Sequence, residues 1–224
     1  MFLKRKDQTM IEGNDRPAPT KTLPRIWDIL VNHFFRLLWA NLLCVICCLP
    51  IITIPASVCG LFSVVQQYYR KGYGDVGSTF FKEFKQNFLI RIGITLGLAV
   101  FPVVGWVLGS LFSAQWAPYA ACAACAVFSL LTISWMYPQM ALLTLKPMQA
   151  LKNAMILTGL ENKRNLGLLV VWVIFGGVTL VMWPLSFILL LFLVPIAPVI
   201  AIHTITEPVI EERIIGKAEA ETVE

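Results

Sequence analysis

Residues 92–145 read IGITLGLAVFPVVGWVLGSLFSAQWAPYAACAACAVFSLLTISWMYPQMALLTL and contain no Asp, Glu, Lys or Arg. One helical crossing of a bilayer takes roughly 20 residues, so these 54 residues are long enough for two crossings. The stretch is interrupted at 113–118, where Trp116 suits the lipid–water interface and Pro118 cannot continue a helix. It therefore predicts a transmembrane helical hairpin.

Two other stretches without charged residues flank this one. The 42 residues between Arg164 and Glu207 also fit two crossings, with a Trp–Pro break at 182–184. The 33 residues between Arg36 and Arg70 would be about 50 Å long as one helix. Two crossings would leave only about 15 residues each, which is short for a membrane span.

Two prolines, Pro50 and Pro55, lie at the centre of that stretch, with Thr53 between them. Prolines this close together favour a turn, and we expect a tight helical hairpin that turns at these residues. The alternative is a re-entrant helix that crosses only half of the membrane, which would leave five full spans.

Lys and Arg lie between the charge-free stretches and not at their central breaks. Seven precede the first stretch, five lie over 70–91, four over 146–164 and two in the C-terminal tail, while 113–118 and 182–184 contain none. Because positive loops face the cytoplasm, both basic loops and both termini are predicted to be cytoplasmic. Two basic segments on one side require an even number of crossings between them, which favours six helices.

The composition excludes a soluble globular protein. Hydrophobic residues make up 58% of the chain and charged residues 14%, and the mean hydropathy is +0.74. Soluble domains are nearer 45–50% apolar and about 25% charged, so too few polar side chains remain here to cover a surface in water. The net charge of +5 and the seven Trp fit a lipid bilayer as partner, and we expect no binding to nucleic acid.

The predicted fold is all-α: a polytopic transmembrane bundle of about six helices with amphipathic helices on the cytoplasmic surface. A disordered cytoplasmic tail is expected over 1–21, the membrane domain over 22–206, and an acidic cytoplasmic tail over 207–224. The spans are predicted at about 37–50, 55–69, 90–112, 119–145, 166–182 and 184–205.

One amphipathic surface helix is predicted from the phenylalanines that recur every four residues before the 90–112 span. Such a helix binds a membrane interface without needing a partner, and its alternative role is to dock a partner protein. The candidate contact residues are Phe80, Phe84, Lys85, Asn87 and Phe88. A similar element over 146–165 makes the order of span, basic amphipathic loop and span occur twice, which is consistent with a weak internal duplication.

Motifs that would indicate enzymatic or metal chemistry are weak. Residues 72–77 match the dinucleotide pattern GxGxxG but lack the preceding strand that this motif needs, so a turn is expected there. All six Cys lie in apolar stretches and are predicted to pack between helices. His33 and His203 are predicted to lie at the membrane surface. We expect no catalytic residue, no metal and no cofactor.

No ionisable residue is predicted within the membrane interior, which disfavours an ion-coupled carrier because such carriers keep costly charges there for function. Uncharged polar residues such as Thr95, Ser134 and Gln139 are expected to bond between helices. They could also line a passive path for a sugar.

The segment LPIITIPAS at 49–57, with YRKG at 69–72 and FFKEFKQNF at 80–88, resembles the YesL family of bacterial membrane proteins. This resemblance implies a protein of the bacterial cell membrane, from a family with no established catalytic activity that often occurs beside carbohydrate ABC-transport systems. It therefore implies a non-enzymatic accessory or assembly factor for carbohydrate uptake, with ABC-transporter membrane subunits as expected partners. The alternative is a transporter or permease for a small polar solute such as a sugar.

Overall fold

The computed structural model describes residues 32–71, 74–112, 114–143, 145–181 and 196–215. Within these residues the chain forms eight α-helices and two short helical elements, which confirms the predicted all-α class. The bounds are α2 Phe34–Cys48, η1 Ile51–Thr53, α3 Ile54–Lys71, α4 Val76–Lys85, α5 Phe88–Gly109, α6 Ala117–Leu142, α7 Pro147–Leu160, α8 Asn162–Val181, α10 Ile196–Ile210 and the π-helical turn η2 Glu211–Ile215.

Four helical segments are long and apolar enough to cross a membrane: α5, α6, α8, and η1 taken together with α3. Helix α2 is a shorter apolar helix. The protein is therefore a multi-pass membrane protein. Helices α2, α3, α5, α6 and α8 begin and end within about four residues of the predicted spans.

The last predicted span, 184–205, falls largely on residues 182–195, which lie outside the described residues. The C-terminal part of this predicted span is described and belongs to α10. The N-terminal tail predicted over 1–21 and the end of the C-terminal tail, from 216 onward, also lie outside the described residues.

Helix α10 continues past the expected end of the membrane domain at residue 206. It runs to Ile210, and η2 extends the helical chain to Ile215. Val209 and Ile210 are fully buried, and Glu207 is 9% exposed. The predicted acidic tail thus begins with an ordered segment, because apolar residues between its charges pack into the core.

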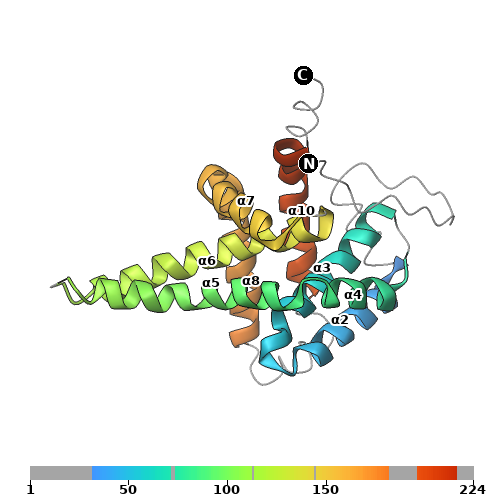
Figure 1. The fold of residues 1–224 in the computed structure, drawn as a ribbon, viewed down its shortest axis with the longest axis horizontal. Coiled ribbons are helices and arrows are strands. Elements are labelled where there is room, and N and C mark those ends of the chain that lie inside the picture. Colours follow the sequence, from blue (N-terminus) through green and yellow to red (C-terminus); the bar gives the residue numbers. More distant parts are fainter. Residues whose placement is uncertain (1–31, 72–73, 113, 144, 182–195, 216–224) are drawn as a thin grey trace.

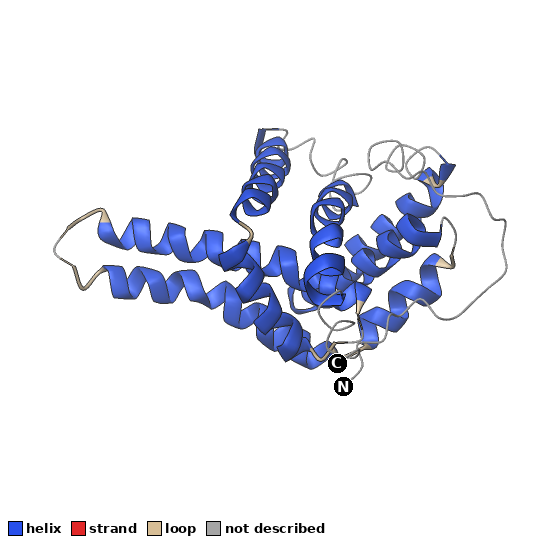
Figure 2. Cartoon of the chain, turned by 90° about the horizontal axis from the view of Figure 1, so that it is seen from above, coloured by secondary structure: helices blue, strands red, loops and turns tan. Residues whose placement is uncertain are grey.

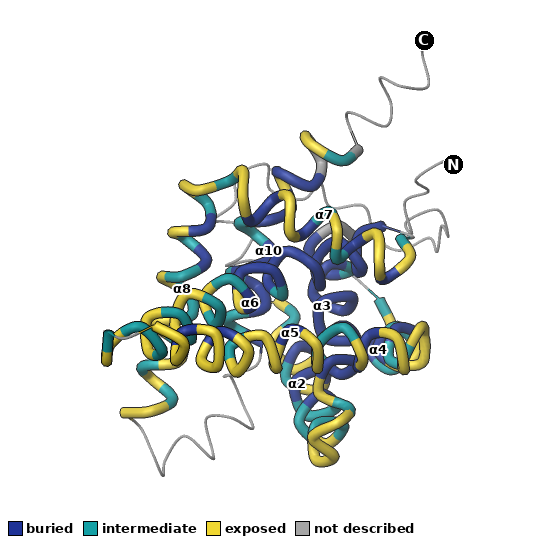
Figure 3. The backbone as a smooth tube through the Cα atoms, turned by 60° about the vertical axis from the view of Figure 1, so that its left-hand side comes forward, coloured by how far each residue is buried: buried dark blue, intermediate teal, exposed yellow. Residues whose placement is uncertain are grey.

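Helices α5 and α6 form a hairpin along the long axis of the molecule (Figures 1 and 2). Helices α8 and α10 run across this axis (Figure 1). Helix α3 lies where these helices meet and packs against α2, α4, α5, α6 and α10. Most of α3 is buried, whereas α5 and α8 leave many apolar side chains exposed, so α3 is the central helix (Figure 3).

The chain turns between α2 and α3 where the two prolines predict a turn. The Thr53 hydroxyl donates to the Pro50 carbonyl at 2.6 Å and also to the Cys47 carbonyl, which links the end of α2 to η1. Ser57 in turn donates from its hydroxyl to the Thr53 carbonyl at 3.1 Å. Pro55 is the second residue of α3, a position where a helix needs no amide donor.

Small residues let α5 and α6 approach closely. A Cβ atom on Gly105 would lie 2.7 Å from the Cys125 Sγ atom and 2.9 Å from the Ala121 carbonyl oxygen. A Cβ atom on Gly109 would lie 2.7 Å from the Pro118 Cα atom. Membrane helices commonly use small residues in this way. Cys125 therefore packs between helices, as the sequence predicts.

Candidate functional site

Polar side chains on the C-terminal half of α6 bind both neighbouring long helices. Trp135 donates from Nε1 to the Asn165 Oδ1 atom of α8 at 2.8 Å, and the Trp172 Nε1 atom donates to the Ser134 Oγ atom at 2.8 Å. The Tyr137 hydroxyl is hydrogen-bonded to a threonine hydroxyl of α5 at 2.9 Å. We call Ser134, Trp135 and Tyr137 the α6 hub.

The α6 hub confirms that uncharged polar residues bond between helices, since Thr95 is the partner of Tyr137. Gln139 differs from them. Its side chain is fully buried, and neither its Oε1 nor its Nε2 atom has a hydrogen-bond partner among the described residues. A buried amide without partners is costly, so Gln139 is an unexplained polar group beside the α6 hub.

Helix α4 is fastened to the C-terminal end of α3. The Tyr68 hydroxyl donates to the Gly74 carbonyl at 2.6 Å, and the Thr79 hydroxyl donates to the Gln67 Oε1 atom at 2.6 Å. A Cβ atom on Gly60 of α3 would lie only 2.9 Å from the Phe80 ring. The absence of a side chain on Gly60 thus allows α4 to lie directly on α3.

The predicted contact residues, which lie in α4 and at the start of α5, do not share one exposed face. Phe80 is fully buried, and Phe84, whose ring stacks on that of Phe80 at 6.1 Å, is half-buried like Phe88. Phe80 is therefore a core residue and not an exposed contact residue, because α4 packs with this side chain against α3. Lys85 and Asn87 are exposed.

Phe81 is a surface residue that the four-residue phenylalanine period does not indicate, since it lies outside the face on which Phe80, Phe84 and Phe88 recur. Its side chain is 41% exposed. Asn87 has a positive φ of 53° and precedes α5, so it makes the left-handed turn between α4 and α5.

A buried ion pair joins α4 to α5. The Arg91 Nη2 atom lies 2.9 Å from the Glu83 Oε2 atom, and the Arg91 Nη1 atom donates to the Glu83 carbonyl at 2.6 Å. The side chain of Arg91 is 2% exposed and that of Glu83 is 6% exposed. The sequence shows both residues but not their contact, because the turn at Asn87 that brings them together is not visible in the helical periodicity.

A similar contact joins α7 to α8. The Asn165 Nδ2 atom donates to the Thr158 carbonyl at 2.6 Å. Asn165 is the fourth residue of α8, as Arg91 is the fourth residue of α5. In both units a buried polar side chain of the second long helix binds a carbonyl near the end of the surface helix. The span, surface helix and span order thus has the same local geometry twice.

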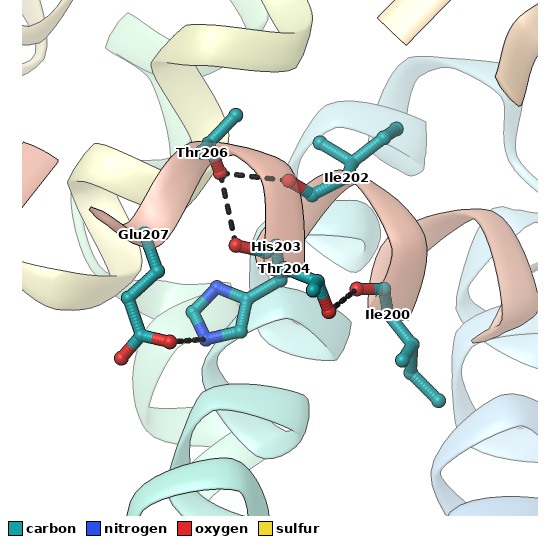
Figure 4. A network of polar contacts seen from close by, with 6 residues as sticks. All are labelled: Ile200, Ile202, His203, Thr204, Thr206 and Glu207. Atoms are coloured by element: carbon teal, nitrogen blue, oxygen red, sulfur yellow. Dashed lines mark hydrogen bonds and ion pairs between the residues drawn. The ribbon is translucent and has the colours of Figure 1, made fainter. Parts of the chain in front are cut away.

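An ionisable group lies in the interior of α10 (Figure 4). The His203 Nε2 atom lies 3.8 Å from the Glu207 Oε2 atom one turn later, and the His203 ring packs edge-on to that of Tyr69 at 5.2 Å. His203 is fully buried. His203 is therefore a core residue of the protein, because α10 stays helical beyond the position where the charge count ends the span. Its predicted place at the level of the membrane surface stays a prediction.

His33 is half-buried and packs on Tyr68, with ring centroids 5.1 Å apart. Arg91 and His203 are both buried within the protein. The prediction that the membrane interior holds no ionisable residue concerns depth in the bilayer, and it stays a prediction.

The end of the last helical segment lies beside the connection between α7 and α8. Arg213 of η2 lies 3.2 Å from Glu161, which separates α7 from α8. This ion pair brings the end of α10 to the α7–α8 connection. The α6 hub meanwhile joins the first turns of α5 and α8 to the last turns of α6.

The GxGxxG pattern over 72–77 ends in a helix cap. Gly72 and Tyr73 lie outside the described residues. Asp75 accepts hydrogen bonds from the backbone N–H groups of Gly77 at 3.2 Å and Ser78 at 3.3 Å, at the first turn of α4. Hydrogen bonds from the Ser78 side chain and backbone, more than that from Gly77, hold the pKa of Asp75 below its usual value.

Cysteines do not gather into a metal site in the described part of the chain. Cys44 and Cys48 lie one helical turn apart with their Sγ atoms at 4.0 Å. No three His, Cys, Asp or Glu side chains of the described residues lie close enough together to hold a metal ion.

Residues 37–114 match the model of a protein family described as "Protein of unknown function, DUF624". The match covers about a third of the chain, from α2 to just beyond α5. It includes the turn at 50–55, helix α4 and the Arg91–Glu83 pair. No curated protein and no solved structure matches the chain significantly.

Proposed function

We propose that this chain is a non-enzymatic accessory protein that assembles or stabilises the membrane subunits of a bacterial ABC-type carbohydrate transporter. The resemblance of residues 49–57, 69–72 and 80–88 to the YesL family supports this role. The structural observation that carries it is the way α4 and α7 are attached to the long helices. Buried polar contacts hold one side of each helix. The other side is left open to a partner.

Helix α7 offers the larger of these open surfaces. Its inner residues Ala150 and Ala154 are fully buried against the rest of the protein. Its apolar residues on the opposite side are exposed, Met148 and Leu160 by 66% each. The outer face of α7 consists of Met148, Met155, Ile156 and Leu160. An exposed apolar patch marks an interaction site, and Met adapts readily to a partner surface.

We place both termini, α4 and α7 on the cytoplasmic side of the bacterial cell membrane. The distribution of Lys and Arg supports this, because the loops over 70–91 and 146–164 carry nine of the chain's 18. The ion pair between Arg213 and Glu161 adds to the support, since it brings the C-terminal end of α10 to the α7–α8 connection. A partner would thus meet α4 and α7 from the cytoplasm.

The test is purification of the tagged full-length chain in mild detergent from cells that use the carbohydrate. We expect an identified ABC-transporter membrane subunit to co-purify with the wild type. The double variant Met148→Gln, Met155→Gln should lose most of that subunit and lower sugar uptake toward the level of a deletion strain. Leu111→Gln, an exposed residue at the far end of the α5–α6 hairpin, is the matched control.

Two results together would exclude the accessory role. One is that no transport subunit is recovered with the wild-type chain. The other is that sugar uptake is unchanged after the gene is deleted.

A transporter in its own right is the second candidate function. The buried His203–Glu207 pair favours it, since ionisable groups inside a membrane protein often serve transport. Liposomes that contain this protein alone separate the two functions. The accessory role predicts no uptake of labelled sugar into them, whereas uptake abolished by His203→Gln would establish a transporter.

A further inference from the structure

A groove of about 580 Å³ lies between α6 and α8, beside the end of α7. Its walls are mostly apolar and include Ala124 and Val127 of α6 with Leu166 and Leu169 of α8. Its volume is that of a site for one small ligand. The groove is open on its outer side, where Leu166 is 65% exposed.

The two helices that form the groove indicate whether it faces water or lipid. Both α6 and α8 are long and apolar enough to cross a membrane. A groove between two membrane-crossing helices opens toward lipid. An acyl chain is therefore the ligand that matches its walls.

The end of the groove nearest α7 is polar. Thr158, Asn162 and Asn165 line it there. Asn162 is the exposed first residue of α8, and the exposed Lys163 follows it directly. The nearby acid Glu161 is 3.2 Å from Arg213, so its charge is already balanced. The local charge is thus positive, and basic pockets between membrane helices suit anionic headgroups.

The geometry points to a binding site for one phospholipid with an anionic headgroup. The acyl chain lies in the groove between Val127 and Leu166, and the headgroup is held at the polar end by Asn162 and Lys163. This site is independent of the proposed transporter partner, which would contact the outer face of α7.

Native mass spectrometry of the full-length protein in detergent tests the site, with phosphatidylglycerol and phosphatidylcholine of identical acyl chains added as probes. We expect the wild type to retain phosphatidylglycerol in preference. Ala124 is exposed and lines the groove, so Ala124→Trp fills the groove. This variant should weaken phosphatidylglycerol binding at least tenfold. A tenfold loss corresponds to about two methylenes of the acyl chain that can no longer be buried. Ala120→Trp, exposed on α6 outside the groove lining, is the control and should bind as the wild type does.

Lys163→Gln tests the headgroup separately and leaves the groove intact. It should lower the preference for phosphatidylglycerol over phosphatidylcholine about fivefold, the contribution of one lysine near an anionic surface. Equal retention of the two lipids by the wild type would overturn the proposal. So would wild-type binding by Ala124→Trp, or an equal loss of lipid in the two Trp variants.

Discussion

At the residue scale, the buried pair of Arg91 and Glu83 has the largest expected effect on stability. Replacing Arg91 by Ala removes the partner of Glu83 at a position where both side chains are almost fully buried. We expect this change to lower the free energy of unfolding by about 3–5 kcal/mol. Denaturant titration of the purified protein in detergent measures the change.

The pair between Arg213 and Glu161 provides the control for that measurement. The side chain of Arg213 is 50% exposed, and exposed ion pairs contribute at most about 1 kcal/mol. Arg213→Ala should therefore have a small effect. Comparable losses of stability in the two variants would mean that the Arg91–Glu83 pair is not buried as described.

Asp75 is a residue whose contribution depends on pH. Its pKa is lower in the folded chain than in the unfolded chain, so its carboxylate stabilises α4 fully above the unfolded value of about 3.9. The stabilisation is lost as the pH falls through the lowered folded pKa. Asn can cap a helix without titrating, so Asp75→Asn should remove this pH dependence.

Hydrogen exchange over residues 76–85, corrected for intrinsic rates, follows the helix through the acidic range. Exchange should accelerate on acidification in the wild type and change less in Asp75→Asn. An identical pH response in the two proteins would show that the cap does not stabilise α4.

At the scale of elements, the α5–α6 hairpin depends on glycines at the contact and not on glycines elsewhere in α5. Gly105→Leu would force its side chain into the Ala121 backbone, and we expect a loss of about 1–3 kcal/mol. Gly97→Leu in the same helix is the matched control, since a Cβ atom there meets nothing within 4 Å. Thermal unfolding in detergent should separate the two variants, and equal melting temperatures would contradict the close packing.

This sequence predicts the positions of the helices more reliably than it predicts which helices pack against one another. The charge-free stretches and the Pro50–Pro55 turn predict α2, α3, α5, α6 and α8, because apolar length and proline position act locally. The surface helices α4 and α7 also follow from local patterns. The far contacts do not, since periodicity shows which face of a helix is apolar but not whether lipid or protein covers it.

Phe80 and His203 show this limit within the candidate site. The apolar face of α4 predicts a helix that lies on the membrane surface. In the structure Phe80, on that face, occupies the space left by Gly60 of α3. His203 reads as the end of a span because Glu207 follows it, whereas the chain stays helical and buried to Ile210. In both cases α3, which is distant in sequence, covers the residue, since Phe80 lies against Gly60 and His203 packs on Tyr69.

At the scale of the whole molecule, polar side-chain contacts join the long helices to one another and to the surface helices. The α6 hub links α5, α6 and α8, while Arg91 and Asn165 hold the surface helices α4 and α7 at the starts of α5 and α8. Helix α3 packs against five other helices at the centre. These contacts give α4 and α7 fixed positions relative to the long helices, which the proposed partner binding requires.

The proposed function requires that α4 and α7 both face the cytoplasm and that the tip of the α5–α6 hairpin lies on the outer side of the membrane. Labelling with a membrane-impermeant maleimide tests it, using single cysteines at exposed positions of a chain whose six native Cys are replaced by Ala or Ser. Ser78→Cys in α4 and Lys152→Cys in α7 should react only after the cells are permeabilised, while Gln115→Cys at the hairpin tip should react in intact cells. Labelling of Lys152→Cys in intact cells, or protection of Gln115→Cys, would contradict the account.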